Sequence, residues 1–265
     1  MIINKKAYAK INLCLKILNR LPNGYHSLHT VMQRISLHDN IKIELKDGSG
    51  NIKIICPDKN LADENNIAYK AADIFFKAAE VSADIIINIE KNIPAQAGLG
   101  GGSSDGAAVL LALNEYFENI LPENILIELA AKTGADVPFF VKNTSRAVCE
   151  GIGEKITPVK NNLKGRVLIV KPVYSISTKQ AFEDWDRYNF THGFKNDFSA
   201  LAFEQNKALR GIYNIILDYG ANQAELTGSG SALFGIFENC DKMRECEKFL
   251  KTREGINFSG IFNFV

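Results

Sequence analysis

The sequence has almost no net charge, few cysteines and no long apolar run, and each absence excludes a class of protein. Its 31 lysines and arginines balance 30 aspartates and glutamates, so no overall field attracts nucleic acid or an acidic membrane. The five cysteines are odd in number and form no Cys-x-x-Cys pair, which indicates reduced thiols rather than a disulfide framework. Any anionic ligand must therefore be bound locally.

Targeting and repeat signals are also missing. No segment approaches the roughly 18 apolar residues of a membrane helix, and Met1 to Lys6 hold no apolar core of signal-peptide length. There is no internal repeat and no low-complexity tract. We therefore expect a cytoplasmic protein without a membrane or nucleic-acid partner. Its 265 residues, 46% of them hydrophobic, can form one large domain or two modest ones, and we expect two.

The most informative segment is glycine-rich. Residues 94–106 read Pro-Ala-Gln-Ala-Gly-Leu-Gly-Gly-Gly-Ser-Ser-Asp-Gly and lead into an apolar run, residues 107–113. Glycines let backbone N–H groups converge without a Cβ in the way, and the first turn of a helix adds partial positive charge. We expect a phosphate-binding loop at the start of a buried helix. A simpler role for Ser103, Ser104 and Asp105 is N-capping of that helix.

Two common phosphate motifs do not match this loop. Gly101 and Gly106 have the Walker spacing, but Ala107 stands where that motif needs lysine. The dinucleotide fingerprint fails because Ser103 replaces its third glycine. The protein-kinase signatures His-Arg-Asp and Asp-Phe-Gly are absent.

A serine hydrolase is an alternative from another class. Residues 102–106 match Gly-x-Ser-x-Gly with Ser104 as nucleophile, and Asp136 and His192 follow in the required order. The nucleophile elbow, however, needs a strand that runs directly into the serine. Here the strand is expected to end near Ile89, well before the loop, so this interpretation is disfavoured.

Apolar periodicity outlines an α+β chain. It predicts strands at residues 7–18, 31–37, 41–45, 52–56, 85–89, 167–170 and 233–237, and a final strand at the end of the chain. It also predicts a hairpin turn at residues 47–51 and a hairpin at residues 147–157. The predicted helices lie at residues 65–79, 107–117, 122–132, 206–219 and 242–252, and a further helix begins at residue 178. Polar turn residues place a domain boundary near Pro158. Alternation puts Lys10 and Asn12 on one face of the first strand. A lysine on such a strand is usually solvated.

Four segments carry a resemblance to a known family. Residues 94–105 resemble the ATP loop of the GHMP kinases, the superfamily of galactokinase, homoserine kinase and mevalonate kinase. Three more segments resemble, in the right order, the branch that acts on 4-diphosphocytidyl-2-C-methyl-D-erythritol: Ala9–Leu13 with Gly24–His26, Gly134–Phe140, and Thr227–Ser231. Asp105 departs from the family, where asparagine is common.

The resemblance implies a fold and an activity. The fold is the α+β, two-domain GHMP kinase fold, with an ATP-binding α/β sandwich (residues 1–157), an α+β, ferredoxin-like C-terminal domain (158–265) and the site between them. The activity is ATP- and Mg²⁺-dependent phosphorylation of the 2-hydroxyl of a small cytidine diphosphate-linked substrate, methylerythritol, in the non-mevalonate route to isoprenoids. Another GHMP small-molecule kinase is the alternative. Oligomeric state and metal ligands are not indicated.

The resemblance also assigns roles to residues. Asp136 resembles the catalytic base and Lys10 its cationic companion; without the family, Asp136 before Val-Pro indicates an N-cap. The ATP loop comprises Pro94, Ala95, Gln96, Ala97, Gly98, Leu99, Gly100, Gly101, Gly102, Ser103 and Ser104, with the serine that meets Mg²⁺ left open. Thr227–Ser231 is expected near the phosphates.

Four residues are expected to bind the substrate. Asn12 orients it, Tyr25 stacks on the cytosine base and His26 hydrogen-bonds the base edge, while Phe182 offers the opposite stacking face. The ordinary alternatives are a solvated turn histidine for His26 and a core side chain for Phe182.

Overall fold

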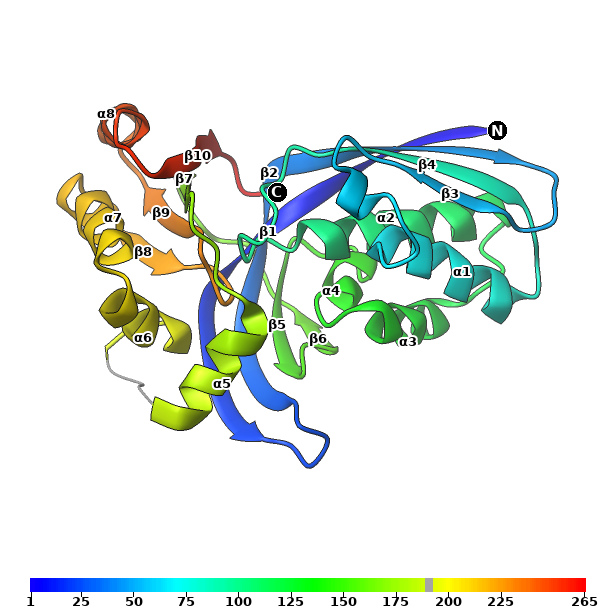
Figure 1. Ribbon diagram of the computed structural model, residues 1–265, viewed down its shortest axis with the longest axis horizontal. Coiled ribbons are helices and arrows are strands. Elements are labelled where there is room, and N and C mark those ends of the chain that lie inside the picture. The colour runs from blue at the N-terminus through cyan, green and yellow to red at the C-terminus, as the bar shows by residue number, and fades with distance from the viewer. Residues whose placement is uncertain (189–192) are drawn as a thin grey trace.

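The computed structural model describes residues 1–188 and 193–265, which form two β-sheets with helices packed against them (Figure 1). The first sheet contains β1 (Ile2–Arg20), β2 (His26–Lys46), β3 (Ile52–Ile55), β4 (Asp84–Glu90), β5 (Arg146–Gly151) and β6 (Lys155–Pro158). Its helices are α1 (Ile67–Ala79), α2 (Gly101–Tyr116), α3 (Glu123–Thr133) and α4 (Val137–Val141), with a short 3-10 turn at Lys59–Leu61.

The second sheet contains β7 (Arg166–Pro172), β8 (Gln223–Leu226), β9 (Leu233–Phe237) and β10 (Ile256–Phe262), and its helices are α5 (Thr178–Tyr188), α6 (Asp197–Gln205), α7 (Lys207–Asp218) and α8 (Cys240–Lys251). Its strand order is β10-β7-β9-β8. In chain order this is 4-1-3-2 with antiparallel pairs, which confirms the ferredoxin-like C-terminal unit. The sequence did not predict α6 or β8.

The hairpin of β1 and β2 links the two halves of the molecule. Register shifts after Tyr8, Asn12 and Ile17 bend the long ladder. Along its other edge, β2 pairs with β4 through residues 40–46 and with β5 through residues 28–33. The sequence predicted two strands here, which is wrong: β2 is continuous, because the carboxylate of Asp39 accepts from the backbone N–H groups of Asn92 and Ile93, just after β4 ends.

The predicted hairpin at residues 47–51 is also wrong. Strand β3 pairs in parallel with β4 and does not contact β2 as a neighbour. The isoleucines of β4, Ile85, Ile87 and Ile89, are all buried, so this more apolar strand takes the position beside β2. The shorter β3, with exposed Lys53, is left at the sheet edge.

One apolar cluster joins the two sheets. It combines Ala9, Ile11 and Ile35 of the hairpin with Val167 and Phe234 of the second sheet. Strands of the first sheet end at Pro158 and those of the second begin at Arg166, and we propose domains of residues 1–157 and 158–265. The domains therefore share a core along the β1–β2 hairpin, which places residues of that hairpin between them.

Two expectations from composition can be compared with the structure. Across residues 1–188 and 193–265, no helix has both the length and the apolar composition needed to cross a membrane. All five cysteines are free, with Cys149 and Cys246 buried. These two thiols therefore serve as small core residues, as predicted, whereas Cys14, Cys56 and Cys240 are only half-buried.

Candidate active site

A cavity of about 1290 Å³ lies between the hairpin, the glycine-rich loop, the start of α4, helix α5 and the Gly228–Ser229 turn. It brings together nearly all the predicted site residues: Lys10, Asn12, Tyr25, His26, Pro94, Ala95, Gln96, Ala97, Gly98, Leu99, Gly100, Gly101, Gly102, Ser103, Asp136 and Phe182. Ser104 is the exception. These residues come from five distant segments, so the shared cavity is a property of the fold.

The glycine-rich loop ends at Gly100, and Gly101–Ser104 form the first turn of α2. Gly100 is the N-cap, with φ +71°, and no side chain caps the helix, so the N-capping expected of Ser103, Ser104 and Asp105 is wrong. A Cβ on Gly100 would lie 3.1 Å from both Lys10 and the Phe140 ring, which leaves no room for a capping side chain. The N–H groups of the first turn stay available to an anion.

Both domains hold the loop in place. The Lys10 N–H donates to Leu99 O at 2.9 Å, and Thr227 Oγ1 donates to Gly98 O at 3.1 Å. The Thr227–Ser231 segment thus lies against the glycine-rich loop. Buried Asn196 fixes that segment in turn, since its Nδ2 donates to Leu226 O and Gly228 O at 2.7 and 2.8 Å.

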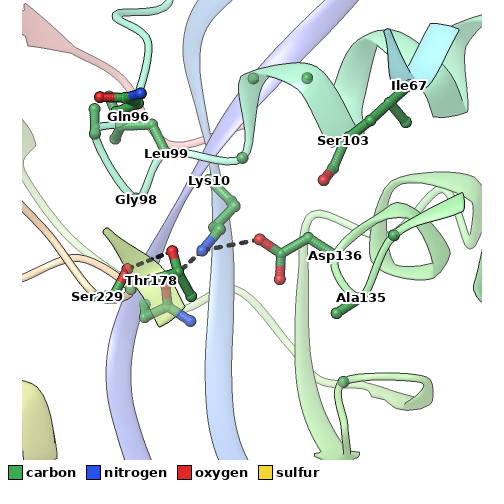
Figure 2. A pocket seen from close by; sticks show the side chains of 18 of the residues that line it. Lys10, Ile67, Gln96, Gly98, Leu99, Ser103, Ala135, Asp136, Thr178 and Ser229 are labelled. Atoms are coloured by element: carbon green, nitrogen blue, oxygen red, sulfur yellow. Dashed lines mark hydrogen bonds and ion pairs between the residues drawn. The ribbon is translucent and has the colours of Figure 1, made fainter. Parts of the chain in front are cut away.

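Lys10 and Asp136 form an ion pair on the cavity wall (Figure 2). Lys10 Nζ lies 3.2 Å from Asp136 Oδ2 and donates to Asn12 Oδ1 at 2.7 Å. The Lys10 side chain is 4% exposed and that of Asp136 28%, so this lysine is not the solvated residue of an ordinary amphipathic strand. Asp136 occupies the N-cap position of α4 but makes no capping bond. Its carboxylate therefore faces the cavity, positioned to accept a proton.

The two serines of the first turn face different ways. Ser103 lines the cavity and points toward the Asp136 side in Figure 2, whereas Ser104 is 3% exposed and lines a separate pocket. Strand β4 ends at Glu90, so no strand leads into Ser104, and the nucleophile elbow is not formed. His192, the histidine of that alternative, lies outside the described residues.

The far end of the cavity is built from aromatic and acidic side chains. Tyr25 is 59% exposed at the hairpin tip, while His26 is buried. The Phe182 ring stacks on His26 with centroids 4.7 Å apart. His26 Nε2 lies 2.6 Å from Asp186 Oδ1. The stacking and base-recognition roles of these residues stay predictions; the structure adds that one nitrogen of His26 is already engaged by Asp186.

A buried charge cluster lies beneath the first turn of α2. Lys91 Nζ contacts Asp39 Oδ2 at 2.5 Å and Asp105 Oδ2 at 2.8 Å, and Asp105 Oδ1 is buried without a hydrogen-bond partner. Burial, opposed by Lys91 and reinforced by Asp39, raises the pKa of Asp105 from 3.8 to about 7. Two carboxylates share one ammonium here. Between about pH 4 and pH 7, the folded protein therefore holds a proton on Asp105 that the unfolded chain releases.

Asp105→Asn is expected to flatten the pH dependence of stability. The native pKa is raised, so the contribution of Asp105 is complete below about pH 4 and is lost as the pH rises toward 7. A shift of about three pKa units corresponds to at most about 4 kcal/mol. The melting temperature of the variant, measured relative to that of the parent, should therefore rise between pH 5 and pH 8.

The control is Asp63→Asn, which changes an exposed turn aspartate. Its melting temperatures should follow those of the parent at every pH. Parallel curves for the parent and Asp105→Asn would contradict the proton assigned to Asp105.

Three site residues were not predicted from the sequence. Asp186 lies on α5, Asn196 caps α6 by accepting from Phe198 N, and Thr178 Oγ1 lies 2.8 Å from Ser229 Oγ. Only Asn196 carries a local signal, because asparagine before an apolar helix is a typical N-cap. Thr178 and its partner Ser229 are 51 residues apart in the sequence, and Asp186 and its partner His26 are 160 residues apart. No local sequence pattern indicates contacts between segments so far apart.

Two family models match this chain. The family model for the GHMP kinases N terminal domain matches residues 66–144, and that for the GHMP kinases C terminal matches residues 179–256. The first match contains the glycine-rich loop and Asp136; the second begins in α5.

Named relatives match almost the whole chain. A 4-diphosphocytidyl-2-C-methyl-D-erythritol kinase of Clostridium botulinum is 36% identical, covering 95% of this chain and 96% of its own. The corresponding protein of Chloroherpeton thalassium is 35% identical, covering 93% of each. A crystal structure of 4-(cytidine 5'-diphospho)-2C-methyl-D-erythritol kinase superimposes with a TM-score of 0.80 at 28% identity, covering 98% and 99%. Mevalonate kinase of L. major, 14% identical, shares the fold with a TM-score of 0.73, over 98% of this chain and 95% of its own. The chain belongs to the GHMP kinase family, in the group of the 4-diphosphocytidyl-2-C-methyl-D-erythritol kinases.

Proposed function

We propose that the protein transfers the γ-phosphoryl group of ATP to the 2-hydroxyl of 4-diphosphocytidyl-2-C-methyl-D-erythritol, a step of the non-mevalonate route to isoprenoid precursors. The observation that carries this proposal is the Lys10–Asp136 pair, which shares one cavity with the first turn of α2 and with Tyr25 and His26. The names of the relatives described above supply the substrate, and the cavity has room for two ligands of nucleotide size.

In the proposed mechanism the protein mainly positions groups and offsets charge. The glycine-rich loop and first turn of α2 receive the ATP phosphates. Asp136 accepts the proton of the attacking hydroxyl. The Lys10 ammonium, held by Asn12, offsets negative charge on Asp136 and on the transferring group. Tyr25 and His26 hold the cytosine base at the other end of the cavity.

The residues present fit a magnesium ion held largely by ATP phosphates. Magnesium in such sites takes one or two protein oxygens and keeps the rest of its shell from phosphate and water. The cavity offers the Ser103 hydroxyl as a protein oxygen, and the described residues contain no group of three or more His, Cys, Asp or Glu side chains that could form a separate metal cage. When bound, the ion neutralises charge on the transferring phosphate.

The alternative within the family is a kinase for a different small alcohol. An ADP-release assay separates the two, with the cytidylylated substrate, free methylerythritol phosphate, homoserine and mevalonate as acceptors. ADP release should depend on the cytidylylated compound alone. Release with every acceptor except that compound would reject the substrate while leaving the kinase activity intact.

Asp186→Asn is expected to weaken substrate recognition selectively. Asp186 Oδ1 lies 2.6 Å from His26 Nε2, and Asp186 Oδ2 lies 3.4 Å from Arg20 Nη1, so the carboxylate orients the His26 ring. Losing one charge-assisted hydrogen bond should raise KM for the cytidylylated substrate about tenfold. KM for ATP should not change.

The matched control is Asp184→Asn on the same helix. Asp184 accepts from Gln180 and Gln205 on the protein surface and does not line the cavity. Both Michaelis constants of the control should equal those of the parent. An equal rise of both constants in Asp186→Asn would indicate general disruption of α5 rather than orientation of His26.

A further inference from the structure

A chain of buried polar groups leads from the Lys10 ammonium into the first sheet. Lys10 Nζ donates to Asn12 Oδ1 at 2.7 Å, and Asn12 Nδ2 donates to Thr30 Oγ1 on β2 at 2.8 Å. The chain ends at the backbone of β1, where the Thr30 hydroxyl donates to Cys14 O at 2.7 Å. Lys10 and Asn12 have roles in the mechanism proposed above, whereas Thr30 has none.

The direction of each hydrogen bond in this chain is fixed from its backbone end. A carbonyl oxygen can only accept, so Cys14 O takes the single hydrogen of the Thr30 hydroxyl. Thr30 Oγ1 is then left as an acceptor, and it requires the NH2 group of Asn12 on its side. The amide oxygen of Asn12 must therefore face Lys10, whose ammonium can only donate.

Solvent cannot take over these hydrogen bonds, because the side chains are buried. Lys10 is 3% exposed, Asn12 1% and Thr30 0%. The backbone of Asn12 is held as well, since its N–H donates to Thr227 Oγ1 at 3.2 Å. A half-turn of the Asn12 amide would exchange its two ends and set an NH2 group against the Lys10 ammonium, which places two donors together without an acceptor between them.

The orientation of the Asn12 amide therefore decides where the Lys10 ammonium is held. While it donates to Asn12 Oδ1, Lys10 Nζ also lies 3.2 Å from Asp136 Oδ2. We propose that Thr30 is a positioning residue for the phosphoryl transfer: it sets the orientation of the Asn12 amide and, through that amide, the position of the Lys10 ammonium beside Asp136. The effect on turnover rests on the proposed function, whereas the orientation of the amide does not.

Two variants at Thr30 separate the role of its hydroxyl from that of its shape. Thr30→Val keeps the shape of the side chain but leaves Asn12 Nδ2 buried without its acceptor. With ATP and the cytidylylated substrate, kcat should fall about tenfold, as expected for the loss of a buried hydrogen bond next to a charged group. KM for ATP should stay within about twofold of the parent value. Thr30→Ser keeps the hydroxyl and loses a methyl group, and it should retain at least half of the parent kcat.

The matched control is Thr144→Val. Thr144 Oγ1 donates to Arg146 O at 2.9 Å, so this variant also loses a bond from a hydroxyl to a backbone carbonyl, but outside the cavity. Its kcat should equal that of the parent. Thermal unfolding of all three variants shows whether each of them is folded.

Hydrogen exchange at the Asn12 side-chain amide tests the inference independently of the reaction. The NMR signal of this amide is assigned by its absence in Asn12→Asp. Exchange with water should be slow in the parent and in Thr30→Ser. It should be at least fivefold faster in Thr30→Val, because that variant removes the bond from Asn12 Nδ2 to Thr30 Oγ1.

Three outcomes would overturn the proposal. They are a kcat of Thr30→Val equal to that of the parent, a kcat of Thr30→Ser as low as that of Thr30→Val, and the same rate of amide exchange in the parent and Thr30→Val. The expected rates of amide exchange, in a parent protein that releases no ADP with the cytidylylated substrate, would uphold the orientation of Asn12 by Thr30 and count against the proposed function alone.

Discussion

Asp136→Asn is expected to lower kcat on the order of a thousandfold, the usual contribution of a positioned general base. The amide has nearly the shape of the carboxylate but cannot accept the proton of the attacking hydroxyl. Lys10 Nζ, 3.2 Å from Asp136 Oδ2, keeps Asn12 Oδ1 as an acceptor in the variant. The geometry of the site should thus survive while its base is lost.

A measurement of ADP binding distinguishes the loss of the base in Asp136→Asn from misfolding of the variant. The dissociation constant for ADP should stay within about twofold of the parent value, because the glycine-rich loop makes its bonds through Lys10 N, Thr227 and Ala232 and none through Asp136. Single-turnover rates and ADP titration measure the two quantities on one preparation. Asp218→Asn, at the exposed end of α7, is the control with unchanged kcat. Full activity in Asp136→Asn would remove this residue from the proposed mechanism.

Local pattern and family resemblance contributed differently to the prediction of this site. Alternation along β1 correctly placed Lys10 and Asn12 on one face, and their side chains are hydrogen-bonded. Alternation also favoured a solvated lysine, which is wrong, because the glycine-rich loop and the Thr227–Ser231 segment lie against Lys10: the Cβ positions of Gly100 and Gly228 are 3.1 and 3.5 Å from its side chain. Burial by a distant segment cannot be read from a strand's own period. For Asp136 the residues alone indicated only an N-cap, and the resemblance was needed to suggest a base.

The errors in the fold have a common physical origin. The 47–51 turn was expected to form a hairpin because its residues favour a turn. The more apolar strand β4, however, pairs with the edge of β2 that β3 would have taken in a hairpin. Similarly, β2 continues through polar residues because Asp39 finds backbone donors at Asn92 and Ile93. Both outcomes depend on segments more than 30 residues away, whereas the helices with strong local signals, α1, α3, α7 and α8, lie close to their predicted bounds.

Gly98→Ala is expected to weaken ATP binding by at least tenfold and to lower the melting temperature. Gly98 has φ +73°, and a Cβ there would lie 2.0 Å from the carbonyl oxygen of Thr227. The left-handed backbone alone costs an alanine roughly 1–2 kcal/mol. The overlap adds to this cost, because the atom it meets is backbone and cannot rotate away. The glycine-rich loop must separate from the Thr227–Ser231 segment, and the hydrogen bond from Thr227 Oγ1 to Gly98 O is lost.

Gly255→Ala is the control that separates the effect of the steric overlap at Gly98 from the effect of the strained backbone. Gly255 has φ +84°, but no heavy atom lies within 4 Å of the position that a Cβ would take there, so the substitution carries the conformational cost without the overlap. Its melting temperature should fall by the smaller amount, with ATP affinity unchanged. Equal losses of stability in the two variants would show that the glycine-rich loop yields to the added methyl group. The larger loss in Gly98→Ala, together with weaker ATP binding, would show that contact between the domains holds the loop in shape.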